Sequence, residues 1–259
     1  SLREQGVETS YVHLLAKLYE EQSGSVRTDC QSKYFNIERG VKQGDPLSSL
    51  IFNCVSESIM RKLKEKWCKK KWGISLHPKL DSQLTNLRFA DDILLTSTSL
   101  THLTQMISDL RTEAAKAGLD LHPDKTKILH NQHTTSKAKT PTHVQVDGLS
   151  IEILPISGST KYLGRQLSFH DIHRTEIEHR IAVAWRKFHM FKQELTGHRY
   201  SLRDRLRLFH GQVTPTAPYG CEAWTLTTDL ENRLRRTQRQ MLRMILHTPR
   251  RNHNHDNTT

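Results

Sequence analysis

Two adjacent carboxylates, Asp91 and Asp92, interrupt the largely apolar run from Leu87 to Leu95. Because side chains on a strand alternate between its two faces, both carboxylates can face one site only if the backbone turns between them. A tight hairpin with the pair at or near its tip meets this requirement. Two anionic groups held close together suit a hard divalent cation, which prefers oxygen ligands. An acidic pair alone is more often a solvated turn, so the surrounding sequence has to decide.

The composition favours a polyanionic partner. The chain has 259 residues, with 39 Lys and Arg against 27 Asp and Glu, which gives a formal charge of +12. Nucleic acid is a better candidate than a membrane, because no stretch approaches the ~20 apolar residues of a spanning helix. The scattered cysteines form no CxxC pair, so neither a disulfide framework nor a structural zinc site is expected, and a reducing compartment fits better.

A glycine-rich loop runs directly into a helix between Gly40 and Asn53. Gly44 lets the backbone approach a ligand closely, and Gln43 has the reach to contact a base or a sugar. Pro46 suits the first helical turn, where its missing donor costs nothing. An ordinary helix-entry loop remains the alternative. One apolar stripe is predicted along this helix, from Ile51, Val55, Ile59 and Leu63.

The other elements up to residue 170 predict a mixture of helices and short strands. Apolar spacing predicts helices over 9–18 and 100–117, the second ending at a Gly118 cap. A turn after Gly118 carries Lys125 into a strand, and Asp147-Gly148 predicts a hairpin turn. Short strands are predicted at 25–29, 33–37, 144–146, 151–153 and 161–164.

After Asp171 the pattern predicts helices alone, and we place a domain boundary near residue 170. Arg203, Arg205 and Arg207 fall away from the apolar face of the second helix, which suits either a surface that grips a nucleic-acid backbone or a solvated one. The three predicted stripes are Ile177, Ile181, Trp185, Phe188 and Leu195; Leu202, Leu206 and Phe209; and Leu226, Leu230, Leu234, Met241 and Ile245.

The order of these segments resembles that of reverse transcriptases from non-LTR (LINE-type) retrotransposons. Residues 40–53, GVKQGDPLSSLIFN, resemble motif B of that family, and residues 89–92, FADD, resemble motif C. The turn around Lys125-Thr126 resembles motif D, and Tyr162-Leu163-Gly164 resembles motif E, the primer grip. The resemblance covers almost the whole chain, and motifs B and C together are its most specific part.

The resemblance implies an α+β fold, in which a reverse transcriptase palm, an antiparallel sheet backed by helices, is followed by an all-helical thumb. It places the palm at 1–170, the thumb at 171–247 and a disordered tail at 248–259. Residues 2–29 resemble the stretch between motifs A and B, so the fingers and motif A are expected to be missing. Residues 219–224, with the helix that follows them, resemble the thumb region of the family.

The implied activity is RNA-directed DNA polymerisation by a two-metal mechanism with Mg²⁺ or Mn²⁺. Asp91 and Asp92 match two of the metal-binding carboxylates, with Asp91 the more direct ligand. Lys125 matches the lysine that neutralises or protonates the leaving pyrophosphate. The remaining implied contacts are Gln43, Gly44, Pro46, Phe89 and Ala90 for nucleotide and template, Tyr162, Leu163 and Gly164 for the primer, and Arg203, Arg207, Arg235 and Arg236 for the nucleic-acid backbone.

The implied partners are an RNA template, a DNA primer or target and deoxynucleoside triphosphates, without a membrane, and the implied place of action is the nucleus. The family's third carboxylate, in motif A, has no counterpart in residues 1–8, so the chain alone is expected to be inactive.

A group II intron-type reverse transcriptase and maturase is a second hypothesis, although the polar tail from His247 shows no maturase domain. A non-catalytic RNA-binding remnant is a third. An RNA-templated RNA polymerase fits the motifs poorly.

Overall fold

We describe the protein from a computed structural model, for residues 1–37, 40–42, 44–77, 79, 83–131 and 141–249. The chain divides into two compact units. The N-terminal unit comprises Ser1–Thr126 and His143–Glu152, and the C-terminal unit comprises Lys127–Thr142 and Ile153–Thr259. Within the described ranges, no helix is long and apolar enough to cross a membrane. Residues 250–259 of the predicted tail lie outside these ranges.

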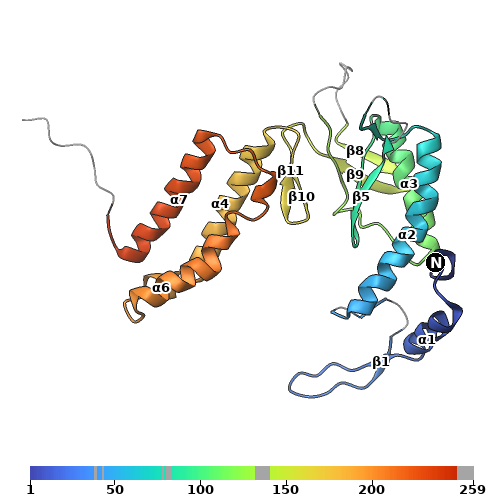
Figure 1. Ribbon diagram of the computed structural model, residues 1–259, viewed down its shortest axis with the longest axis horizontal. Helices are drawn as coiled ribbons and strands as arrows, with labels where there is room; N and C mark the ends of the chain where they lie inside the picture. The colour runs from blue at the N-terminus through green and yellow to red at the C-terminus, as the bar shows by residue number, and fades with distance from the viewer. Residues whose placement is uncertain (38–39, 43, 78, 80–82, 132–140, 250–259) are drawn as a thin grey trace, which may run out of the picture. The chain divides into compact units, whose positions relative to one another are not determined.

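The N-terminal unit combines helices with short antiparallel strand pairs (Figure 1). Its helices are η1 (Arg3–Gln5), α1 (Thr9–Tyr19), α2 (Pro46–Lys69) and α3 (Leu100–Lys116). Its strands pair as β1 (Ser23–Gly24) with β2 (Phe35–Asn36), β3 (Ile74–Ser75) with β4 (Gln83–Leu84), β5 (Asn86–Phe89) with β6 (Asp92–Leu95), and β8 (His143–Val146) with β9 (Leu149–Ile153). The predicted strands at 25–29 and 33–37 are therefore wrong in their bounds. The first strand lies before the predicted range, at Ser23–Gly24, and the second occupies only Phe35–Asn36 of its range.

Local sequence signals fix two of these elements. Gly118 follows α3 with a φ of 73°, the left-handed conformation expected of a C-terminal cap. Asp147 and Gly148 have φ values of 49° and 82°, as a two-residue hairpin turn requires. Both predictions are confirmed.

The core of this unit forms where α2 packs against α3. Ile93 and Leu95 of β6 pack against it, so one strand of the β5–β6 hairpin is anchored on the core. In the predicted α2 stripe, Ile59 and Leu63 are buried, whereas Ile51 and Val55 are only half-buried. The buried core residues are Ile59, Met60, Leu63, Trp67, Met106 and Leu110.

Trp67 and Asp109 link the two helices by a buried polar contact. Trp67 is completely buried, and its Nε1–H donates to Asp109 Oδ2 at 3.0 Å. Lys66 Nζ donates to Asp109 Oδ1 at 2.8 Å, and Gln105 donates to the same oxygen at 3.3 Å. Burial by itself raises the pKa of Asp109, but these hydrogen bonds outweigh it and hold the pKa below its ordinary value.

Asp109 is therefore expected to make the stability of the unit depend on pH. Its folded-state pKa is lowered, so its stabilisation is complete above the unfolded-state pKa of about 3.9 and is lost as pH falls through the folded value. At pH 7 we expect Asp109→Asn to lower the free energy of unfolding by about 1–3 kcal/mol, as for a buried charged hydrogen bond. Urea titrations at pH 7 and at a pH well below the unfolded-state pKa of about 3.9 should show this difference shrinking, and a constant difference would contradict the assignment.

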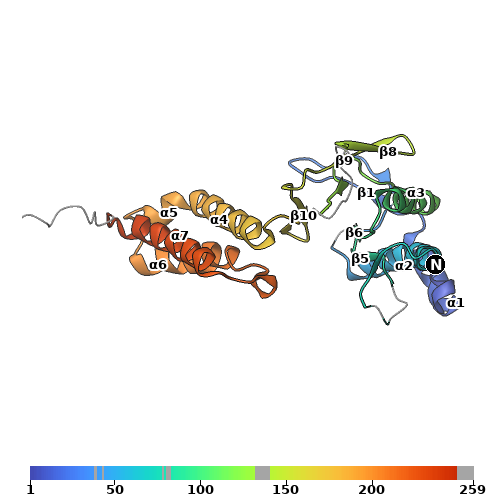
Figure 2. The ribbon, with the colours of Figure 1, turned by 90° about the horizontal axis from the view of Figure 1, so that it is seen from above.

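The C-terminal unit is mainly helical, and Figure 2 shows α4, α6 and α7 gathered into one bundle. Its strands are β7 (Lys127–Ile128), β10 (Thr160–Tyr162) and β11 (Arg165–Leu167). Its helices are α4 (Ile172–Met190), α5 (Lys192–Thr196), α6 (Leu202–Leu208), η2 (Phe209–Val213), η3 (Thr214–Thr216), η4 (Cys221–Ala223) and α7 (Thr228–Leu246). The bundle core comprises Ala184, Phe188, Leu195, Phe209, Val213, Met241 and Ile245.

Several predictions in this unit were wrong in detail. Phe209 and Leu226 lie outside α6 and α7, and Arg205 does not fall away from the apolar face but is half-buried and donates its Nη1–H to Ile245 O at 2.8 Å. The first stripe is not one helix, because the backbone leaves the helical conformation at Phe191, and Leu195 reaches the core from the separate helix α5. The predicted strand at 161–164 ends at Tyr162, because Leu163 and Gly164 have φ values of 49° and 77° and turn the chain into β11.

Candidate functional site

The two carboxylates lie at the tip of the β5–β6 hairpin. Phe89 pairs with Asp92 in the strand register, so Ala90 and Asp91 form the turn itself. Ala90 has a φ of 53°, and a positive φ of this kind is typical of two-residue turns. Both Asp side chains are exposed, and neither carboxylate has a hydrogen-bond or ion-pair partner among the described residues. The predicted hairpin with the acidic pair at its tip is confirmed.

The hairpin is held against α2 by an ion pair one residue before its last strand pair, Phe89 with Asp92. Arg88 Nη2 donates to Glu57 Oε2 at 2.8 Å, and Arg61 Nε lies 3.5 Å from Glu57 Oε1. The hydrogen bond from Arg88 is the main reason that the pKa of Glu57 lies below its ordinary value. Phe89, beside the tip, is 66% exposed. The hairpin is thus fixed to α2 close to its tip and presents its acidic turn to solvent.

Two depressions border the hairpin within the N-terminal unit. A groove of about 770 Å³ lies along α2 and β5, and its lining residues include Ser49, Asn53, Glu57, Lys64, Arg88 and Phe89. A smaller, mainly apolar cavity of about 170 Å³ is lined by side chains of α2, β6 and α3 and by residues 119–121. Asp91 and Asp120 are the acidic residues of its lining.

Asp120 is a further acidic residue beside the hairpin turn, which sequence reasoning did not single out. It lines the same cavity as Asp91, is exposed and lies 3.6 Å from Arg111 Nε. The only sequence signal was its place two residues after the Gly118 cap. Across the ranges that the structure describes, no three His, Cys, Asp or Glu side chains form a group that could hold a metal ion. The structure thus brings Asp91 and Asp92 together and adds Asp120 nearby, without completing a metal site.

Lys125 is exposed on the turn that precedes β7. Its backbone N–H donates to His122 O at 3.2 Å, which fixes the turn. For the described part of the chain, no contact joins the Lys125 side chain to Asp91 or Asp92. The structure therefore places Lys125 in the same compact unit as the acidic pair but does not bring the groups into contact.

Asp45 caps the N-terminus of α2. Asp45 accepts hydrogen bonds from Leu47 N at 3.3 Å, Ser48 N at 3.2 Å and the Ser48 hydroxyl at 2.9 Å, and the hydroxyl contact is the main cause that lowers the pKa of Asp45. Gly44 has a φ of 89°, and Pro46 occupies the first helical turn as predicted. Gln43 lies outside the described residues.

The predicted primer residues lie in the C-terminal unit. Tyr162 ends β10, and Leu163 and Gly164 form the turn between β10 and β11. Leu163 is 38% exposed. The three residues are therefore adjacent at one hairpin tip, although only Tyr162 belongs to a strand.

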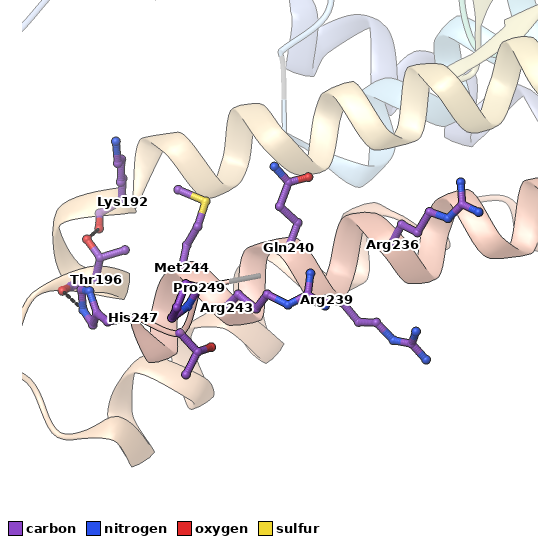
Figure 3. A pocket seen from close by; sticks show the side chains of 10 residues that line it. Lys192, Thr196, Arg236, Arg239, Gln240, Arg243, Met244, His247 and Pro249 are labelled. Carbon is purple, nitrogen blue, oxygen red and sulfur yellow. Dashed lines mark hydrogen bonds between the residues drawn. The ribbon is translucent and has the colours of Figure 1, made fainter. Parts of the chain in front are cut away.

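The predicted backbone-binding arginines do not form one cluster. Arg203 and Arg207 are exposed on α6, and Arg235 of α7 is paired with Glu231 at 2.6 Å. Arg236 lines a groove of about 1060 Å³ along α7, shown in Figure 3. Sequence reasoning missed the other cations of this groove. The spacing of Arg236, Arg239 and Arg243 along α7 already places them on one helix face, whereas Lys192 joins them only because α5 packs against α7. The basic groove, as we name it, is lined by Lys192, Thr196, Arg236, Arg239, Gln240, Arg243, Met244, His247, Thr248 and Pro249.

Comparison with known proteins identifies the family. Residues 2–167 match the family model described as reverse transcriptase (RNA-dependent DNA polymerase). A transposon-derived protein of Caenorhabditis elegans is 32% identical over 167 residues, which are 63% of this chain and 57% of that protein. The Pol polyprotein from the type-1 retrotransposable element R2 of Popillia japonica is 25% identical over 218 residues, or 82% of this chain and 34% of that protein.

A third relative, the Pol polyprotein from the type-2 element R2DM of Drosophila melanogaster, is 31% identical over 169 residues, or 63% of this chain and 15% of that protein. The chain thus spans between about a seventh and somewhat more than half of these relatives. The family match covers more than half of the chain and includes the FADD and GVKQGDPLSS motifs. The chain therefore belongs to the reverse transcriptase (RNA-dependent DNA polymerase) family, and its relatives confirm the resemblance to non-LTR retrotransposon enzymes.

Proposed function

We propose that this chain carries part of the active site of a non-LTR retrotransposon RNA-directed DNA polymerase. The observation that supports this most strongly is the placement of Asp91 and Asp92, exposed and without partners at the tip of an anchored hairpin. Buried or paired carboxylates would serve the fold, whereas this pair has no structural partner to satisfy. The substrates in this proposal are an RNA template, a DNA primer or target and deoxynucleoside triphosphates.

The carboxylate oxygens of Asp91 and Asp92 suit two Mg²⁺ or Mn²⁺ ions, which bind few protein carboxylates together with substrate phosphates and water. When bound, the ions would stabilise the attacking and leaving oxygens of an in-line displacement. In this proposal Asp91, within the turn, is the more direct ligand, and Asp92 supports it. Ala90 and the exposed Phe89 ring lie beside the primer terminus, and Lys125 neutralises or protonates the pyrophosphate.

Other residues position the nucleic acid. Gly44 and Pro46, at the start of α2, contact the nucleotide and template in this proposal, and the family resemblance assigns the same role to Gln43. The turn at Tyr162, Leu163 and Gly164 contacts the primer. Arg203 and Arg207 contribute to backbone binding from α6. The site of action of such an enzyme would be the nucleus, where its DNA target lies.

The basic groove is proposed as the main backbone-binding surface of the C-terminal unit. Lys192, Arg236, Arg239 and Arg243 are exposed in it, and no ion pair engages them within the described ranges. Free cations on one face suit the phosphates of a nucleic-acid duplex, which bind by charge rather than by sequence.

We expect the Arg239→Gln/Arg243→Gln double variant to bind an RNA–DNA hybrid at least about tenfold more weakly. The slope of log affinity against log salt should fall by about 2, because each lost phosphate contact removes about one unit. Fluorescence anisotropy over a salt series measures both. Arg233→Gln is the matched control, since Arg233 lies on the same helix but is paired with Glu178 at 2.7 Å. Equal losses in the control and the double variant would contradict a role for the groove.

We also propose that residues 1–259 alone do not sustain polymerisation, because two carboxylates cannot replace the three that position both ions. Primer extension on an RNA template with Mg²⁺ tests this in the chain alone and in any longer reading frame that contains it. Extension only in the longer protein supports both proposals, and robust extension by the chain alone contradicts the second. Hybrid binding without extension in either would favour the non-catalytic RNA-binding alternative, which the +12 charge also permits.

A further inference from the structure

We propose that Glu176 and Arg180 are positioning residues that set the backbone conformation of the turn between β10 and β11. The inference rests on the proposed function only in taking this turn as a primer contact. Both side chains belong to α4, and the turn that they contact is formed by Leu163 and Gly164. All of these residues lie in the C-terminal unit.

Glu176 and Arg180 are both buried, although burial removes the hydration of two charged groups and is therefore costly. Glu176 is completely buried and Arg180 is 5% exposed, and Arg180 Nε donates to Glu176 Oε1 at 2.6 Å. A buried ion pair loses so much hydration that apolar residues of similar volume often give equal or greater stability. Stability alone therefore explains this pair poorly, whereas a requirement for a specific local conformation explains it well.

The pair also hydrogen-bonds the backbone of the hairpin, and a second cation, Arg165 of β11, lies with its Nε 3.9 Å from Glu176 Oε1. Gln166 N–H, in β11, donates to Glu176 Oε2 at 2.5 Å. On the other side of the pair, Arg180 Nη2 donates to the carbonyl oxygen of Gly164. One carboxylate and one guanidinium thus bind a donor and an acceptor only two residues apart, and they do so regardless of the side chains at those positions.

The turn that they bind has an uncommon backbone. Leu163 is a non-glycine residue with a φ of 49°, a region that such residues rarely adopt and that persists where surrounding contacts enforce it. Tyr219 completes the enclosure, because its ring lies 4.7 Å from the Arg180 guanidinium carbon and its hydroxyl donates to Leu163 O at 3.5 Å. A Cβ on Gly164 would come within 3.4 Å of the Tyr219 ring.

Amide hydrogen exchange of the full chain tests the positioning role directly. In Glu176→Gln and Arg180→Lys we expect the Gln166 amide to exchange about ten- to a hundredfold faster, as for the loss of a charged hydrogen bond. Arg180→Lys keeps the charge but cannot bridge Glu176 and Gly164 together, so it should not rescue the turn. Glu178→Gln is the matched control, because Glu178 lies on the same helix in an exposed pair with Arg233.

The exchanged pair Glu176→Arg/Arg180→Glu separates positioning from simple ion pairing. It keeps the charges and their spacing on α4 but presents a donor to Gln166 N–H and an acceptor to Gly164 O. In this exchanged pair we expect the Gln166 amide to exchange its hydrogen as fast as in the single variants. Restored protection, or single variants that lower the melting temperature while protection of Gln166 stays unchanged, would overturn the proposal.

Anisotropy with an RNA–DNA primer hybrid, run on the same proteins, tests the link to the primer. We expect Glu176→Gln and Arg180→Lys to weaken hybrid binding about three- to tenfold, with Glu178→Gln unchanged, as for the loss of about one hydrogen-bonded contact. Faster exchange with unchanged binding would overturn the primer link. A wild-type chain that does not bind the hybrid would contradict the proposed function, while the exchange experiment would still decide the positioning role.

Discussion

Replacement of Asp91 by Asn is expected to lower RNA-templated DNA synthesis by about a thousandfold, because a metal-binding carboxylate contributes several kcal/mol to transition-state stabilisation. Asn is close to Asp in size, and Asp91 has no described partner in the fold, so the hairpin should be unchanged. Primer extension in a protein that is active before substitution measures the loss.

Two companion variants sharpen this experiment. Asp92→Asn should cost at least about tenfold less than Asp91→Asn, because Asp92 begins β6 rather than forming the turn. Glu65→Gln is the control, since Glu65 is an exposed α2 residue paired with Lys69. Activity that survives Asp91→Asn but not Glu65→Gln would contradict the assignment of the site.

Replacement of Trp67 by Ala is expected to lower the free energy of unfolding by about 3–5 kcal/mol, as for other buried Trp residues. The change leaves a cavity between α2 and α3 and removes one of the three hydrogen bonds to Asp109. Chemical denaturation followed by circular dichroism measures the loss.

Trp72→Ala is the matched control for this prediction. Trp72 is half-buried and stacks on His102 with a centroid separation of 5.2 Å, so its removal should have a markedly smaller effect. Trp67→Phe should lose less than Trp67→Ala, because the ring is kept and only the hydrogen bond is lost. Equal losses for Trp67→Ala and Trp72→Ala would contradict the assigned core.

The features that sequence reasoning predicted correctly are those with local causes. The acidic hairpin tip follows from the alternation of strand side chains, and the Gly118 cap and the Asp147-Gly148 turn follow from the positive φ that they require. Pro46 likewise marks the start of α2 through its missing donor. In each case the physical reason is contained within a few neighbouring residues.

The features that were missed depend on residues far apart in the chain. Trp67 lies within a basic stretch of the sequence, but α3 packs over it, and Asp109, 42 positions later, accepts its indole N–H, so it is a buried core residue. Asp120 lies 29 positions after Asp91, and the two residues line one cavity because α3, which connects them, packs beside the hairpin. Glu176 and Arg180 resemble an ordinary surface pair at i and i+4 until the hairpin covers them.

The choice of nucleotide on an RNA template tests the central claim most directly. A DNA primer is annealed to RNA templates that differ only in their first unpaired base, and single deoxynucleotides are offered with Mg²⁺ to the longest protein that contains these residues. We expect only the complementary nucleotide to be added, and chelation of the metal to stop the reaction. Addition that ignores the template base, or a protein that binds the hybrid and adds nothing, would contradict the claim that this chain carries part of an RNA-directed DNA polymerase site.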